Sequence, residues 1–293
     1  MLAEGSQRHT DPAQDTRNEQ PSTHGLVIDT DAILCEFAQM STEFVTAEDG
    51  VELAYERQGE GPAIVLVHGF ASSRAQNWRS TGWYGGLTAA GFSIVAMDCR
   101  GHGESGKPHD AAFYDHDRMA EDVITVMQAC DLSDALILGY SMGGFIGLRL
   151  LASRPERVRK LAIAGVGETY LQDRITAPGA RSVLADALLT PDKDSITDPR
   201  AKMFRAFADQ PGKDRLALAA CMRAMSPHLP LDVLSRLQRP VLVVDGSEDD
   251  TAGRPEPLAE VIAGARAVTI PGRNHNTAVG DKHTRQAVID FFR

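Results

Sequence analysis

Residues 135–155 read ALILGYSMGGFIGLRLLASRP and decide the fold. The apolar run 135–139 predicts a buried strand, and 141–155 predicts a helix that ends before Pro155. Between them lies Gly139-Tyr140-Ser141-Met142-Gly143, where a serine on a tight strand-to-helix turn needs small neighbours on both sides. A plain helix cap is the alternative for Ser141. The strand before it and the helix after it favour a nucleophile.

Outward from this stretch, strands alternate with helices. Such alternation predicts an α/β domain with a mostly parallel sheet, helices on both faces and an antiparallel hairpin turning at Asp49-Gly50. The expected strands are 63–69, 92–98, 159–165, 240–246 and 267–272, and the expected helices are 80–91, 115–130, 255–263 and 283–293.

The domain is predicted to cover residues 44–293, after an N-terminal extension, 1–43. The first part of that extension lacks apolar periodicity, which is typical of disorder. About 70 residues separate the strand ending near 165 from the one starting near 241, whereas a parallel crossover needs about a dozen. The surplus predicts an inserted helical cap at about 168–238. Its helices are expected at 180–189, 199–209 and 214–226.

Composition restricts the partners. The chain has 293 residues and a formal net charge of −10, which disfavours nucleic acid and anionic membranes because their charges would repel it. No run of 18 apolar residues and no secretory signal is present, so a cytoplasmic protein is expected. The four cysteines, Cys35, Cys99, Cys130 and Cys221, form no C-x-x-C pair, and free thiols are expected.

Further motifs stand in a fixed order around Ser141. His68-Gly69-Phe70 follows a predicted strand, Asp98-Cys-Arg-Gly-His-Gly-Glu-Ser105 follows the next, and a late Gly246-x-x-Asp249 precedes an isolated His275. With these motifs, residues 44–293 resemble the α/β-hydrolase superfamily. The resemblance implies an eight-stranded sheet and a catalytic triad in the order serine, acid, histidine.

The resemblance also implies an oxyanion hole made by the backbone N–H groups of Phe70 and Met142. For His68, Arg100 and His102 it favours structural roles, bracing the loops beside the site.

A hydroxyl becomes a nucleophile when a base removes its proton, and histidine suits this task near neutral pH. His275, in the loop after the last predicted strand, is favoured over His283. The family pattern selects Asp249 as the acid. Spacing leaves Asp250 open, and Glu168 is a weaker candidate.

These residues predict a hydrolase that cleaves a carboxylic ester through an acyl-enzyme, without a metal or organic cofactor. Carbon–carbon bond hydrolase, thioesterase, lactonase and perhydrolase activities would use the same triad, and a non-catalytic binding module is a further alternative. An aspartate nucleophile is excluded because the turn carries Ser141.

The expected partner is a small to medium, partly apolar ester. Trp78 and Tyr140 are predicted to bind it as aromatic walls together with Phe70. Helical spacing in the cap predicts an apolar roof above Ser141, made of Leu184, Leu188, Met203, Phe207, Leu218 and Met222.

Overall fold

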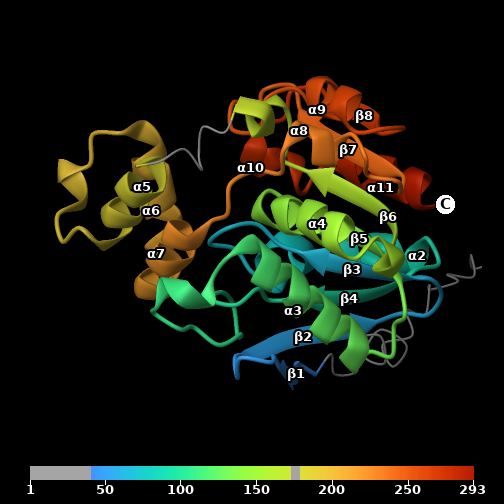
Figure 1. The fold of residues 1–293 in the computed structure, drawn as a ribbon, viewed down its shortest axis with the longest axis horizontal. Coiled ribbons are helices and arrows are strands. Elements are labelled where there is room, and N and C mark those ends of the chain that lie inside the picture. Colours follow the sequence, from blue (N-terminus) through green and yellow to red (C-terminus); the bar gives the residue numbers. More distant parts are fainter. Residues whose placement is uncertain (1–40, 173–178) are drawn as a thin grey trace, which may run out of the picture. The chain divides into compact units, whose positions relative to one another are not determined.

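Eight strands form one sheet in a computed structural model that describes residues 41–172 and 179–293. The order across the sheet is β1-β2-β4-β3-β5-β6-β7-β8, which Figure 1 shows from β1 to β8. The strands are β1 (Glu43–Thr46), β2 (Glu52–Gln58), β3 (Ala63–Val67), β4 (Ser93–Met97), β5 (Ala135–Tyr140), β6 (Val158–Ala164), β7 (Val241–Gly246) and β8 (Arg266–Ile270).

All neighbouring strands from β4 to β8 pair in parallel, and β1 and β2 add an antiparallel edge. Parallel strands place their carboxyl ends at one edge of the sheet, where α/β proteins bind ligands. The predicted fold class, a mostly parallel eight-stranded sheet flanked by helices, is confirmed.

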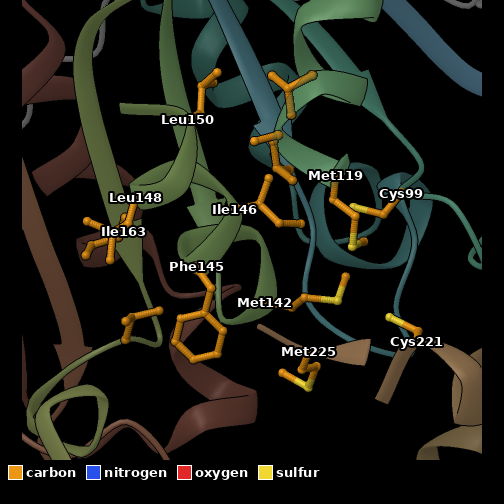
Figure 2. Close-up of a cluster of buried hydrophobic side chains, with 14 of the residues drawn as sticks. Cys99, Met119, Met142, Phe145, Ile146, Leu148, Leu150, Ile163, Cys221 and Met225 are labelled. Carbon is orange, nitrogen blue, oxygen red and sulfur yellow. The ribbon is translucent and has the colours of Figure 1, made fainter. Parts of the chain in front are cut away.

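Alternate residues of the strands face two hydrophobic cores, since successive side chains point to opposite faces. One core joins Val65, Ile137 and Ile163 to helices α3 (His116–Ala129) and α4 (Met142–Ser153). The other joins Ile64, Leu66 and Leu138 to α2 (Trp83–Ala89) and α11 (Lys282–Phe292). Figure 2 shows Met142, Phe145 and Ile146 of α4 in the first core, near Cys99, Cys221 and Met225. Both faces of the sheet are therefore covered.

The helix expected over 80–91 is present as the shorter α2, Trp83–Ala89. A π-helical turn, η1 (Ala75–Arg79), precedes α2, and Gly82 between them has a φ of 78°, a left-handed conformation that ends one element before the other begins. Other short elements are η2 (Ala111–Phe113), η3 (Pro155–Arg157), η4 (Glu168–Gln172), η5 (Lys193–Ser195), α9 (Pro255–Val261) and α10 (His275–Ala278).

In the described part of the stretch between β6 and β7 lie four α-helices: α5 (Ala180–Leu189), α6 (Pro199–Ala208), α7 (Arg215–Ala224) and α8 (Leu231–Leu234). Figure 1 shows α5, α6 and α7 grouped together beside the sheet. The proposed bounds of the cap, 168–238, stay a prediction. Most of the predicted extension and residues 173–178 lie outside the described residues.

Among the described residues, no helix is long and apolar enough to cross a bilayer. The same part of the chain contains no cluster of three or more histidine, cysteine or acidic side chains suited to a metal ion. Cys99, Cys130 and Cys221 are free thiols, and Cys35 lies outside the described residues.

Candidate active site

Ser141 occupies the turn between β5 and α4 in a strained conformation. Its φ of 52° and ψ of −114° are unusual for a residue with a side chain. A Cβ at Gly139 would lie 2.2 Å from the Gly143 carbonyl oxygen, and one at Gly143 would lie 2.0 Å from the Val67 oxygen. Both flanking glycines are therefore required by space, as the sequence pattern predicts.

His275 begins α10, directly beyond the carboxyl edge of the sheet. Its Nε2 lies 3.1 Å from the Ser141 Oγ. Asn274 caps α10 through a reciprocal capping box, and the Tyr140 hydroxyl donates to the His275 carbonyl oxygen. The imidazole also packs closely against Gly165: a Cβ at that position would lie only 2.9 Å from His275 Cε1. The imidazole is thus held in a defined position next to Ser141.

Asp249 follows β7 and completes a hydrogen-bonded chain with His275. Its Oδ2 lies 2.9 Å from the His275 Nδ1, and its Oδ1 accepts the N–H groups of Thr251 at 3.0 Å and Ala252 at 2.8 Å. The Asp249 side chain is fully buried. The structure therefore brings Ser141 together with two residues that follow it by more than 100 positions in the chain, Asp249 and His275.

The other acidic candidates lie elsewhere. Asp250 is exposed, and no hydrogen bond joins it to His275 in the described part of the chain. Glu168 pairs with Arg254. A further buried carboxyl, Asp245, accepts the Val166 N–H at 2.9 Å, and burial raises the pKa of Asp245 well above its usual range.

Two residues beside Ser141, Phe70 and Met142, carry backbone N–H groups that could bind an oxyanion. Neither the Phe70 N–H nor the Met142 N–H has a backbone acceptor within residues 41–172 and 179–293, and Met142 is the first residue of α4. Free N–H groups at a helix N-terminus favour negative charge. Both residues line the cavity above Ser141.

His68 precedes Gly69 and Phe70 and stabilises the loop after β3. His68 Nδ1 lies 2.8 Å from the Gly69 carbonyl oxygen, and its Nε2 accepts the Cys99 N–H at 3.0 Å. Complete burial lowers the pKa of His68 to about 3, so the ring is neutral near pH 7. Arg100 binds Asp122 and Asp49, which fixes the neighbouring loop.

A cavity of about 310 Å³ opens above Ser141. This volume is near the lower end of ligand pockets, which span about 300–1,000 Å³. Apart from the residues already described, its walls include Ala71, Ser72, Gln76, Asn77, Phe145, Met203, Phe204, Phe207, Gln210, Met222, Met225, Asn276 and Val279. A second, open cleft of about 890 Å³, at the amino ends of β6–β8, contains none of the predicted site residues.

Three of the six side chains expected to form an apolar roof line the cavity above Ser141: Met203, Phe207 and Met222. Leu184, Leu188 and Leu218 are instead buried in the first core, and the helices that carry them, α5 and α7, pack against each other.

The two predicted aromatic walls differ. Tyr140 lines the cavity, but Trp78 does not: its side chain is fully buried and packs edge-on against Trp83 and Tyr140. The neighbouring Asn77 takes the place expected of Trp78. Sequence reasoning missed Asn77, Phe145, Phe204 and Met225, since helical spacing cannot tell which side of a buried turn faces a cavity.

Comparison with known proteins supports the fold. A family model described as the alpha/beta hydrolase fold matches residues 62–205. A hydrolase structure from Pseudomonas aeruginosa PA01 aligns with a TM-score of 0.67 and 28% identity, over 86% of this chain and 98% of that one. The enol-lactonase from Burkholderia xenovorans LB400 aligns with a TM-score of 0.64 and 25% identity, over 85% and 99% of the two chains.

Among curated proteins, bifunctional epoxide hydrolase 2 from Sus scrofa is 34% identical over 128 residues, covering 44% of this chain. The chain spans only 22% of the length of that relative. The acetyltransferase component of an acetoin cleaving system from Pseudomonas putida is 32% identical over 71% of this chain and 59% of its own length. With its sheet order and its nucleophile turn, this chain belongs to the α/β-hydrolase superfamily.

Proposed function

We propose that the protein is a serine hydrolase that cleaves a carboxylic ester through an acyl-enzyme. The observation that carries the proposal is the position of His275, whose two ring nitrogens lie 3.1 Å from the Ser141 hydroxyl and 2.9 Å from the Asp249 carboxylate. A base within hydrogen-bond reach of the nucleophile, itself oriented by a third group, is the arrangement that activates a serine.

In the proposed reaction, His275 Nε2 takes the Ser141 proton while Oγ attacks the ester carbonyl carbon. The N–H groups of Phe70 and Met142 bind the resulting oxyanion. His275 then passes the proton to the leaving alcohol, and the carbon–oxygen bond breaks. Water enters, gives a proton to His275 and attacks the acyl carbon. The bond from this carbon to Oγ then breaks, His275 returns the proton to the Ser141 Oγ, and the acid is released. Asp249 keeps the Nδ1 proton in place and stabilises the imidazolium.

The cavity supports a substrate of modest size. Methionine and phenylalanine make up eight of its twenty lining residues, from the loop after β3, from α4, and from α6 and the α7 region. About 310 Å³ holds a short acyl chain together with a small alcohol group. A partly apolar ester or lactone fits these walls, since methionine side chains adapt to irregular apolar groups.

The primary test is a chain-length series of 4-nitrophenyl esters from acetate to decanoate. Wild-type protein is expected to release nitrophenol, and Ser141→Ala should lower kcat/KM by roughly 10⁴–10⁶. Ser153→Ala, on the exposed end of α4, is the matched serine control and should behave as wild type. A fluorophosphonate should add one phosphonyl group to Ser141, seen by mass spectrometry of the intact protein and its peptides.

Two results would redirect the proposal. Failure of the folded wild-type protein to turn over any ester or react with the fluorophosphonate would favour a binding module. Turnover of a ring-fission dienone, but not of simple esters, would favour carbon–carbon bond cleavage by the same residues.

A further inference from the structure

Asn77 holds a fixed position in the wall of the cavity. It lies in the π-helical turn η1, where its N–H donates to the Ser73 carbonyl oxygen at 2.8 Å and its own carbonyl oxygen accepts the Thr81 hydroxyl at 2.5 Å. The residue is only 6% exposed. Single π-turns occur frequently at functional sites. The backbone therefore fixes where this side chain can point.

The orientation of the Asn77 amide follows from its neighbour. Its Oδ1 accepts the Gly69 N–H at 2.9 Å. Because a backbone N–H can only donate, the amide oxygen must face Gly69 and the NH₂ group must face away. A Cβ built on Gly69 would lie 3.4 Å from the Ser141 Cβ and 3.7 Å from this oxygen, so the amide is close to the nucleophile turn.

The NH₂ group of Asn77 donates no hydrogen bond to any described residue of the protein. No acceptor for it exists within residues 41–172 and 179–293, yet Nδ2 is not an enclosed, unsatisfied atom. Asn77 lines the cavity, so the nitrogen is open to that space. The cavity walls combine apolar side chains, among them Phe70, Met203 and Phe207, with a smaller polar area from residues such as Gln210. A bound substrate would displace water from this donor.

We propose that Asn77 determines substrate specificity by donating a hydrogen bond to a second acceptor oxygen in the substrate. The preferred class would be esters that carry an ether, keto or ring oxygen a few bonds from the scissile carbonyl. This inference rests on the proposed ester hydrolysis at Ser141. Its physical basis is that an ester without such an oxygen leaves a buried donor unpaired, which costs affinity.

The test compares esters that differ in one atom. The pairs are 4-nitrophenyl butanoate with methoxyacetate, and 4-nitrophenyl pentanoate with 3-methoxypropanoate, in which an oxygen replaces a CH₂ group at two different positions. For each enzyme the ratio of kcat/KM, ether over alkyl, is measured. Comparing these ratios between enzymes cancels the intrinsic reactivity of each ester and any general loss of activity.

Asn77→Asp keeps the oxygen that accepts the Gly69 N–H and removes the donor. In at least one pair, the wild-type ratio should exceed that of this variant by about three- to tenfold, the effect of one hydrogen bond. Asn77→Ala, which adds no charge, should lose the same preference and serves if the aspartate variant does not fold. Gln128→Glu makes the same change from amide to carboxylate on the exposed face of α3, outside the cavity, and should keep the wild-type ratio.

The outcomes separate the two proposals. Equal ratios in wild type and both Asn77 variants, for both pairs, overturn the role of Asn77, while Ser141-dependent turnover would leave the proposed hydrolysis intact. A wild-type protein that hydrolyses none of the four esters overturns both.

Discussion

Replacing Asp249 by asparagine should trap His275 in the wrong tautomer. Asp249 Oδ1 accepts two backbone N–H groups, at 2.8 and 3.0 Å, while Oδ2 lies 2.9 Å from the His275 Nδ1. In the variant the amide oxygen must stay with the two backbone donors, since an NH₂ group there would face them unpaired. The new NH₂ group therefore points at Nδ1.

That contact forces Nδ1 to accept a hydrogen bond and moves the imidazole proton to Nε2. Nε2–H, 3.1 Å from the Ser141 Oγ, cannot take the serine proton. The full negative charge beside the developing imidazolium is lost as well. A comparable exchange in a serine protease lowers turnover about 10⁴-fold, which corresponds to about 5.4 kcal/mol of transition-state stabilisation. We expect a loss of similar size here.

The assay is kcat/KM for a short 4-nitrophenyl ester, with thermal unfolding to verify the fold. Asp250→Asn is the matched control, because Asp250 is exposed and adjacent, and its kcat/KM should stay within about twofold of wild type. The reasoning is refuted if Asp249→Asn keeps activity within tenfold of wild type, or if Asp250→Asn causes the larger loss.

Three other substitutions test the nucleophile turn, the cavity wall and a buried histidine. Gly143→Ala should lower kcat/KM at least 100-fold and reduce the melting temperature, because its Cβ would lie 2.0 Å from the Val67 oxygen. Met203→Trp should reduce kcat/KM for the octanoate roughly tenfold more than for the acetate, since it fills a cavity of about 310 Å³; equal losses would contradict this. Burial lowers the pKa of His116 to about 3, below the unfolded value near 6.5, so its share of stability is complete above pH 6.5 and is lost as the pH falls toward 3. His116→Gln should reduce the slope of unfolding free energy against pH between 5 and 6 by about 1.4 kcal/mol per unit, whereas exposed His109→Gln should not.

The sequence by itself determined the fold class and the chain positions that meet at the sheet edge. Short apolar runs that alternate with helical segments favour parallel strands buried between helices, and such strands place their carboxyl ends together. The predictions for Ser141 and His275 needed only their places after β5 and β8. The need for glycine on both sides of Ser141 could be predicted because such a turn has no room for side chains.

Only the tertiary structure decided which of two neighbouring side chains faces the active site, as for Asp249 and Asp250 or for Asn77 and Trp78. Asp249 and Asp250 are neighbours with the same chemistry, and only the turn after β7, closed by N–H groups of Thr251 and Ala252, buries one of them against His275. The π-turn that hides Trp78 and exposes Asn77 to the cavity likewise depends on packing against distant strands. Local periodicity carries no information about such long-range contacts.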